Sequence, residues 1–227
     1  MSSSKTAIVI GATGLVGREV VKLLLEDERY GKVKVFVRRP IGLSDPKLEH
    51  HIIDFNNPVT WEKLISADEL YSCLGTTIKA AGSKDAQYKV DYSYQFQIAI
   101  AAAEYGIPNY ALVSSFGADS DSRFFYSRMK GELDRDISKL KFSKICIIRP
   151  SLLLGNRPEK RIMENISAVL WKIFAPFIPA LKKYKPIPAQ TVARAMINAL
   201  NQDFEGLRIY ELIEIFELAA LYPRIKS

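Results

Sequence analysis

The sequence is poor in the residues that build disulfide frameworks and metal centres. Its 227 residues include only two cysteines, Cys73 and Cys146, and two histidines, the adjacent His50 and His51. Both cysteines lie in apolar runs that predict buried strands, where a free thiol packs as a small hydrophobic side chain. The adjacent histidines are typical of a strand edge. A disulfide scaffold is therefore excluded, and we expect no metal site, because no Cys/His/Asp group has ligand spacing.

The sequence also lacks an apolar run long enough to cross a membrane. Residues 166–181 form the most apolar stretch, but Lys172, Pro176 and Pro179 interrupt it, and it falls short of the ~20 residues that a spanning helix needs. We interpret this stretch as a buried lid or as a helix at a dimer interface. The protein is accordingly expected to be a monomer or a homodimer. Peripheral membrane attachment is the alternative, with four lysines as basic anchors. These are Lys172, Lys182, Lys183 and Lys185.

No targeting segment is recognisable at the N-terminus. Residues 1–6 are polar, carry a single lysine and lead directly into an apolar run. A secretory signal needs an apolar core, and a transit peptide is amphipathic and arginine-rich, so neither pattern is present. Together with the unpaired cysteines, this predicts a cytoplasmic protein.

The charge is basic, with a formal net charge of +7 and a pI of about 9.3. The basic residues are scattered among acidic ones, and no zinc-finger spacing or aromatic RNA-binding signature accompanies them, so we expect no nucleic-acid partner. A small anionic ligand explains the charge more simply. With 48% hydrophobic residues, the chain can bury one substantial core but not two.

Apolar runs alternate with amphipathic segments along the chain. Strands that are apolar throughout and alternate with helices predict a parallel sheet covered on both faces by right-handed crossovers. The fold class is therefore α/β with a doubly wound parallel sheet in one domain, residues 1–227, in which residues 151–206 form a small lid on the substrate side. The predicted strands are residues 7–10, 33–37, 52–53, 70–74, 110–113 and 145–148, and the clearest helices begin at Leu15 and span 86–105, 122–140, 162–174 and 191–200.

A glycine-rich turn, GATGLVG, joins the first strand to the first helix. Gly11 would allow a sharp turn, Gly14 a close approach of the backbone to a pyrophosphate, and Gly17 close packing of helix against strand. The helix N-terminus would then present free N–H groups to the anion. A plain connecting turn and an S-adenosylmethionine site are the alternatives. The turn residues that we expect to contact a dinucleotide are Gly11, Thr13, Gly14, Leu15, Val16 and Gly17.

Two arginines follow the second strand, at the position where an NAD-preferring site carries an acid for the ribose 2′-hydroxyl. Arg38 and Arg39 suit a 2′-phosphate, because a guanidinium bonds it with two donors and stacks on adenine. The sequence therefore predicts NADP(H) in preference to NAD(H), although a solvated basic loop would have the same composition. Asp54, after the third strand, is expected to accept a hydrogen bond from the adenine amino group, unless it only caps the strand.

Tyr126 and Lys130 are four residues apart in a predicted helix, so they project from one face. A nearby ammonium favours the phenolate and brings a phenol with a pKa near ~10 closer to working pH as an acid or base. Ser115, chosen over Ser114 at the end of the fifth strand, would bond the substrate oxygen. An ordinary helical pair is the alternative for the tyrosine and lysine.

Six motifs taken together, GATGLVG, FVRRP, CLGTT, ALVSSFGA, YSRMK and IRPSLLLG, resemble those of an atypical short-chain dehydrogenase/reductase. The chain is most similar to the Tat-interacting-protein, oxidoreductase-like group, which is also described as nucleoside-diphosphate-sugar epimerase-like. The resemblance implies an NADP(H)-binding Rossmann fold, with Tyr126 and Lys130 matching the active-site pair. It also implies cofactor contacts at Thr13, Gly14, Arg38, Arg39, Leu74, Gly75 and around residues 152–157, to which we add Thr76 of the same CLGTT motif.

Two departures argue against sugar-nucleotide epimerisation. Tyr126 follows Ser115 by only eleven positions, and the C-terminal part is too short for a nucleotide-sugar domain. The sequence thus predicts an NADP(H)-dependent oxidoreductase that moves hydride to or from a small carbonyl or alcohol, with apolar lining from Leu153, Phe174, Phe177 and Ile178. An NADP(H)-binding regulatory or scaffold protein with little turnover is the alternative.

Overall fold

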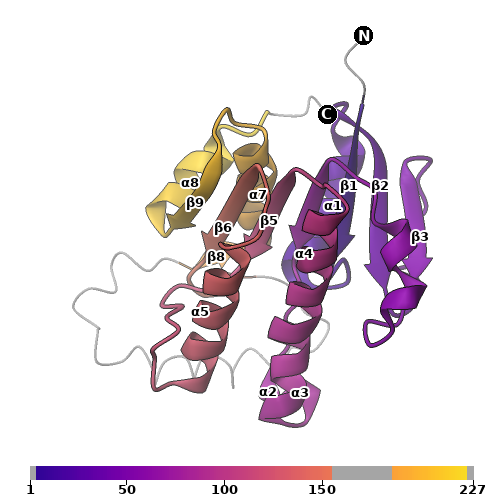
Figure 1. The fold of residues 1–227 in the computed structure, drawn as a ribbon. Coiled ribbons are helices and arrows are strands. Elements are labelled where there is room, and N and C mark those ends of the chain that lie inside the picture. Colours follow the sequence, from indigo (N-terminus) through magenta and orange to yellow (C-terminus); the bar gives the residue numbers. More distant parts are fainter. Residues whose placement is uncertain (1–3, 155–185, 224–227) are drawn as a thin grey trace.

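A seven-stranded parallel sheet forms the centre of the computed structural model, which describes residues 4–154 and 186–223. The strand order is β3-β2-β1-β4-β5-β6-β9, and every neighbouring pair is parallel. Because the chain starts in the middle and winds outward in both directions, the order reverses beside β1, between β1 and β4 (Figure 1). The strands are β1 (Lys5–Ile10), β2 (Tyr30–Val37), β3 (Leu48–Ile52), β4 (Glu69–Ser72), β5 (Asn109–Val113), β6 (Lys144–Arg149) and β9 (Gly206–Glu211).

One face of the sheet is covered by α1 (Leu15–Glu26), α7 (Ala189–Leu200) and α8 (Ile213–Ala220). Val16, Val20 and Leu24 recur at helical spacing in α1, and all three are buried against Ala7 and Val9 of β1. The helix α7 packs against both α1 and α8, so the C-terminal part of the chain completes this layer.

The opposite face is covered by α4 (Tyr94–Glu104) and α5 (Phe125–Ile137), which lie side by side in Figure 1. Ile98 and Ala102 of α4, with Leu133 and Ile137 of α5, pack onto the alternate residues of the strands. Two short 3₁₀ turns, at Pro58–Thr60 and Glu62–Leu64, bring Trp61 and Ile65 into the same layer. These two layers confirm the prediction of a doubly wound α/β sheet.

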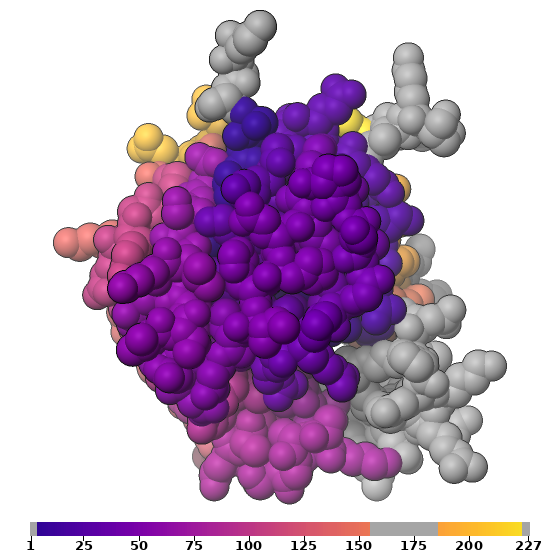
Figure 2. Space-filling model, turned by 90° about the vertical axis from the view of Figure 1, so that its right-hand side faces the viewer, coloured from indigo at the N-terminus to yellow at the C-terminus, as the bar shows by residue number. Residues whose placement is uncertain are grey.

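The sheet edges depart from the prediction that the strands are apolar throughout. The third strand begins at Leu48, before the predicted residues 52–53, and Ile52 is 62% exposed because β3 has a partner on one side only. His50 and His51 lie in this edge strand. The face of the molecule beyond it is built mainly from the N-terminal part of the chain, coloured violet in Figure 2.

The predicted helix 86–105 is also more complex than the pattern indicates. Short helices α2 (Ile78–Ala81) and α3 (Lys84–Tyr88) precede a π-helical turn at Lys89–Ser93, which continues into α4. One wider turn changes which side chains face the sheet. The other predicted elements that fall within the described residues are confirmed to within a few residues at each end.

Part of the predicted lid lies outside the described residues. The described section contains β7 (Leu153–Leu154) and β8 (Ile187–Pro188), which pair with each other, followed by α7 and β9. Residues 155–185, with the predicted helix 162–174, the apolar stretch 166–181 and its lysines, and the lining residues Phe174, Phe177 and Ile178, are outside it. Within the part that is described, no helix has the length and apolar character to cross a membrane.

Candidate functional site

The glycine turn after β1 adopts a conformation that its three glycines make possible. Gly11 has a φ of +80°, and a Cβ there would lie 2.4 Å from the Cys73 backbone. A Cβ on Gly17 would lie 2.2 Å from the Gly11 carbonyl oxygen. The N–H of Gly14, the N-cap of α1, donates to that oxygen at 2.9 Å. The sharp turn and the close packing of helix on strand, predicted for Gly11 and Gly17, are therefore confirmed.

A cavity of about 350 Å³ opens at this turn, beside the point where the strand order reverses. This inner cavity brings together the glycine turn, the end of β2 and the segment after β4, as expected for a ligand site of a doubly wound sheet. Of the predicted cofactor-binding residues, Gly11, Thr13, Gly14, Arg38, Leu74, Gly75 and Thr76 line it. The other residues expected to contact the cofactor do not line it, nor does Ser115. These are Leu15, Val16, Gly17, Arg39, Asp54, Tyr126 and Lys130.

Arg38 lines the inner cavity, whereas the equally exposed Arg39 follows it outside the lining. Neither guanidinium makes a hydrogen bond or an ion pair with any other residue of the described ranges. A cation that no carboxylate neutralises is suited to an incoming anion. Of the two arginines, Arg38 is thus the one beside the space that an anion could enter.

Asp54 caps the turn that follows β3. Its Oδ1 accepts hydrogen bonds from the backbone N–H and the side-chain amide of Asn56, at 2.9 and 3.0 Å. These bonds lower the pKa of Asp54, and the charge of Lys89 contributes in the same direction. The strand-end cap, one of the two roles considered from the sequence, is therefore present, while the adenine contact stays a prediction.

Lys130 is buried on the inner face of α5 and pairs with a carboxylate that the sequence reading missed. Its Nζ lies 3.2 Å from Asp91 Oδ1, and the two side chains are 4% and 2% exposed. The other oxygen, Asp91 Oδ2, accepts the backbone N–H of Thr76 at 2.8 Å. Asp91 thus connects the cavity wall to the Lys130 ammonium.

Burial by itself would lower the pKa of Lys130, but the charges of Asp91, Tyr126 and Asp134 together with the Asp91 hydrogen bond outweigh it, and the pKa is raised. Lys130 is therefore held as an ammonium in a nearly dry environment. Tyr126, half-buried in the first turn of α5, is close enough to Lys130 to interact with it electrostatically.

The two candidate serines point to different surroundings. Ser114 is buried, and its hydroxyl faces the carboxylate of Asp134 on α5. Ser115 is half-buried, and its Oγ donates to the Phe116 carbonyl at 3.3 Å. Ser115 is the less buried of the two, but neither serine lines the two described cavities, so a substrate contact of Ser115 stays a prediction.

The π-helical turn and the start of α4 supply buried polar residues that the motifs do not contain. Asp91 and Gln95 lie on the same buried stripe as Ile98 and Ala102, and Gln95 links Ser72 Oγ to the Asp91 carbonyl through bonds of 2.6 Å each. An acid and an amide at helical spacing with apolar residues were the available signal. The cavity lining also includes Cys73, Ala80, Ala81, Ala86, Lys89, Val90 and Tyr94.

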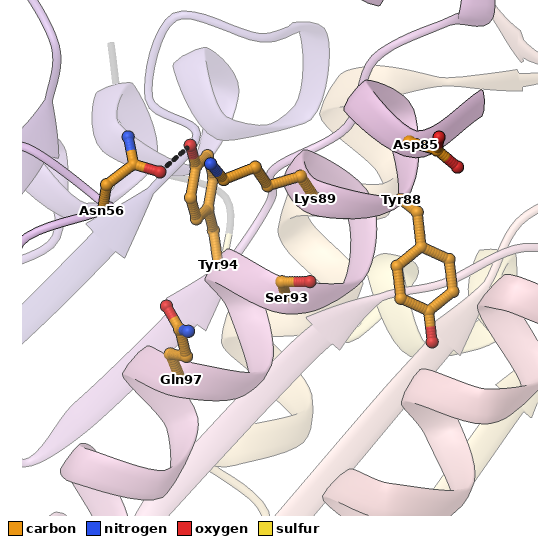
Figure 3. Close-up of a pocket in the computed structure, with 7 residues that line it drawn as sticks. All are labelled: Asn56, Asp85, Tyr88, Lys89, Ser93, Tyr94 and Gln97. Carbon is orange, nitrogen blue, oxygen red and sulfur yellow. Dashed lines mark hydrogen bonds between the residues drawn. The ribbon is translucent and has the colours of Figure 1, made fainter. Parts of the chain in front are cut away.

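A second, outer cavity of about 480 Å³ adjoins the first along the π-helical turn (Figure 3). Lys89 and Tyr94 line both cavities and form the wall between them. Tyr94 is fixed there, because its ring stacks on Phe55 at 5.2 Å between centroids and its hydroxyl donates to Asn56 Oδ1 at 3.0 Å. The remaining lining residues are Asn56, Asp85, Tyr88, Ser93 and Gln97.

Solved structures with nicotinamide dinucleotides share this fold. A short-chain dehydrogenase/reductase superfamily protein from Agrobacterium tumefaciens with bound NAD matches with a TM-score of 0.71 and 14% identity, over 91% of this chain and 77% of that one. The enzyme WbmH of Bordetella bronchiseptica, in complex with NAD⁺, matches with a TM-score of 0.70 and 15% identity, over 96% and 80%. The Rossmann-type fold implied by the motifs is thereby confirmed.

Curated relatives correct the predicted location. Protein FMP52-1, mitochondrial, of Scheffersomyces stipitis is 34% identical over 224 residues, which cover 94% of this chain and 98% of that protein. Protein FMP52, mitochondrial, of Saccharomyces cerevisiae is 39% identical over 158 residues, 68% of each. The prediction of a cytoplasmic protein is therefore wrong. It rested on the unpaired cysteines and on the lack of an N-terminal signal or transit pattern, and neither observation tests for other kinds of targeting signal.

The family assignment rests on a match that extends over most of the chain. The model of a family described as NAD(P)H-binding covers residues 11–203, from the glycine turn to just beyond α7. This agrees with the resemblance to short-chain dehydrogenases/reductases stated from the motifs. The chain belongs to the NAD(P)H-binding family, together with the FMP52 proteins that it resembles.

Proposed function

We propose that the chain is an NADP(H)-dependent oxidoreductase that interconverts a small carbonyl compound and its alcohol. The observation that carries the proposal is the inner cavity, which joins the glycine turn and Arg38 to the loop that Asp91 ties to Lys130. The glycine turn borders the cavity at the N-terminus of α1, where an anion is favoured, and Arg38 adds an unpaired charge. The cavity residues therefore fit a phosphorylated dinucleotide.

The Gly11–Gly14 turn would hold the pyrophosphate, and Arg38 the 2′-phosphate. The bound nicotinamide would supply hydride to the carbonyl carbon. Tyr126 would donate its phenolic proton to the carbonyl oxygen, and Ser115 would hydrogen-bond that oxygen as negative charge develops. Lys130, kept protonated by Asp91, would stabilise the phenolate that remains.

A binding protein with little turnover is the second candidate, and one observation favours it. The Lys130 ammonium already has a buried partner, so its contact with Asp91 would also be explained by a purely structural role. In that case nicotinamide dinucleotides would bind and change partner affinity without being consumed.

One variant separates the two candidates. NADPH absorbance is followed against a panel of aldehydes and ketones for the wild type and Tyr126→Phe. The oxidoreductase is supported if wild-type turnover falls at least ~100-fold in the variant while NADPH affinity stays within about twofold. Tight NADPH binding without any oxidation would support the binding protein. No affinity for NADPH or NADH would contradict both.

We further propose a mitochondrial location, on the strength of the names of the FMP52 relatives. Expression of the chain with a C-terminal fluorescent tag, followed by fractionation, tests it. Recovery with a mitochondrial marker is expected, and recovery only in the soluble cytosolic fraction would contradict the proposal.

A further inference from the structure

Lys89 occupies the wall between the inner and outer cavities. It opens the π-helical turn and lines both spaces together with Tyr94. Its Nζ lies 5.8 Å from the centroid of the Tyr94 ring, and Figure 3 shows the two side chains next to each other. The ring is held in place by Phe55 and Asn56, so the lysine is the movable member of the pair.

The charges around the inner cavity suit an anionic ligand. The described residues that line it include two cations, Arg38 and Lys89, and no Asp or Glu. In the described ranges Lys89 forms no ion pair within 4.0 Å. Two cations around a space without a carboxylate favour a ligand with more than one negative charge.

The neighbours of Lys89 indicate which end of the inner cavity it serves. Asp54 follows β3, and the charge of Lys89 helps to lower its pKa. The strand β3 pairs with β2, with Val37 opposite Ile52, so the ends of both strands lie at the same edge of the sheet. Arg38 follows Val37 directly, and this edge is where a dinucleotide places its adenosine ribose.

We propose that Lys89 is a second phosphate-binding residue, which acts with Arg38 on the 2′-phosphate of a phosphorylated adenine dinucleotide. The proposal rests on the proposed function, since it names a specificity-determining residue of the same site. The exposed Arg38 has no neighbour that fixes its side chain, whereas Lys89 approaches the same cavity from the π-helical turn. Two cations from two different elements would select the phosphorylated form more strongly than one.

Lys84 provides a matched control. Its Nζ also lies over an aromatic ring, 5.6 Å from the Phe125 centroid, but it lines neither cavity. If Lys89 acts only through its contact with the Tyr94 ring, substitution of either lysine should have the same effect on ligand affinity. If Lys89 binds phosphate, only its substitution should lower the affinity.

The test uses 2′,5′-ADP and 5′-ADP, two probes with and without the 2′-phosphate and without a nicotinamide. Calorimetry on the full chain compares the wild type with Lys89→Gln, Lys89→Arg and Lys84→Gln. We expect Lys89→Gln to weaken 2′,5′-ADP binding roughly tenfold, as for loss of one charge-assisted contact, and 5′-ADP binding by less than about twofold. Lys89→Arg and Lys84→Gln should stay within about twofold of the wild type for both probes.

Two results would overturn the inference. One is a ratio of the two affinities in Lys89→Gln that equals the wild-type ratio, whether or not both affinities fall, and the other is a wild-type ratio near one. A wild-type titration with NADPH and NADH separates this failure from failure of the proposed function. If neither dinucleotide binds, the proposed function itself is refuted. Circular dichroism checks that each variant retains the wild-type fold.

Discussion

Lys130 keeps its charge in a place from which water is almost excluded. A buried ammonium is stable only when a carboxylate compensates for the lost hydration, and Asp91 provides it at 3.2 Å. The same carboxylate accepts the Thr76 N–H on the cavity wall. At the scale of single residues, the stability of the fold and the electrostatics of the site thus depend on one acid.

Asp91→Asn should destabilise the protein by about 3–5 kcal/mol at pH 7, because it leaves a buried charge without its partner. The raised pKa of Lys130 means that the wild-type contribution is fully present below the unfolded value of 10.5 and is lost as the pH rises through the folded value. In the variant, burial would instead lower the pKa of Lys130, so raising the pH to about 10 relieves the buried charge. Urea unfolding at several pH values should show that the difference in free energy of unfolding between the wild type and Asp91→Asn decreases from pH 7 to pH 10.

Asp203→Asn serves as the control for that series. Asp203 is exposed at the turn before β9, so its loss should change the free energy of unfolding by no more than about 0.5 kcal/mol. If the difference in free energy of unfolding between the wild type and Asp91→Asn stays constant with pH, Lys130 does not titrate in the variant.

At the scale of elements, the turn from β1 to α1 gives two glycines separable roles. In Gly17→Ala the new Cβ would clash with the Gly11 backbone, so we expect a loss of about 3 kcal/mol or more. In Gly14→Ala the nearest atom is 3.2 Å away, so stability should change by less than about 1 kcal/mol while dinucleotide affinity falls. Thermal unfolding and calorimetry on both variants check this, and equal stability losses would contradict it.

The sequence predicts the helix 86–105 correctly as an element but not its π-helical turn. Apolar spacing identifies a helix through its average period, and one wider turn hardly changes that average. The turn is nevertheless what places Asp91 and Lys89, two site residues that the motifs do not contain. The glycine turn, Arg38 and the segment Leu74–Thr76 were accessible because their roles depend on local backbone and strand order.

At the scale of the whole molecule, the alternation of strands and helices was enough to predict a doubly wound parallel sheet, because few topologies satisfy short right-handed crossovers. The first and last residues of β3 were not predictable from apolar runs, because an edge strand is partly exposed to solvent and its residues need not be apolar. The acid in β4 was missed for a different reason. Glu69 is fully buried, and its partners come from distant parts of the chain.

Glu69 links β1, β2 and α7 at the amino end of the sheet. It accepts hydrogen bonds from Lys5 Nζ at 2.8 Å, from Tyr30 at 2.7 Å and from Tyr71, while Asn201 bonds both Lys5 and Tyr30. We expect Glu69→Gln to lower the free energy of unfolding by about 3 kcal/mol in urea. Glu49→Gln, which removes an exposed pair with Lys32, should cost less than about 1 kcal/mol. Similar losses in the two variants would contradict this role.

Ligand binding should stabilise the whole molecule, since the inner cavity exists only when β1, β2 and β4 are assembled. At an NADPH concentration about 100 times its Kd, mass action adds about 2.7 kcal/mol, or a rise in Tm of ~5–10 °C for a chain of this size. NADH at the same concentration should raise the Tm less, because Arg38 gains no 2′-phosphate partner. In Arg38→Gln the rise in Tm with NADPH should fall toward the rise with NADH. An undiminished difference between the two would show that Arg38 does not bind the 2′-phosphate.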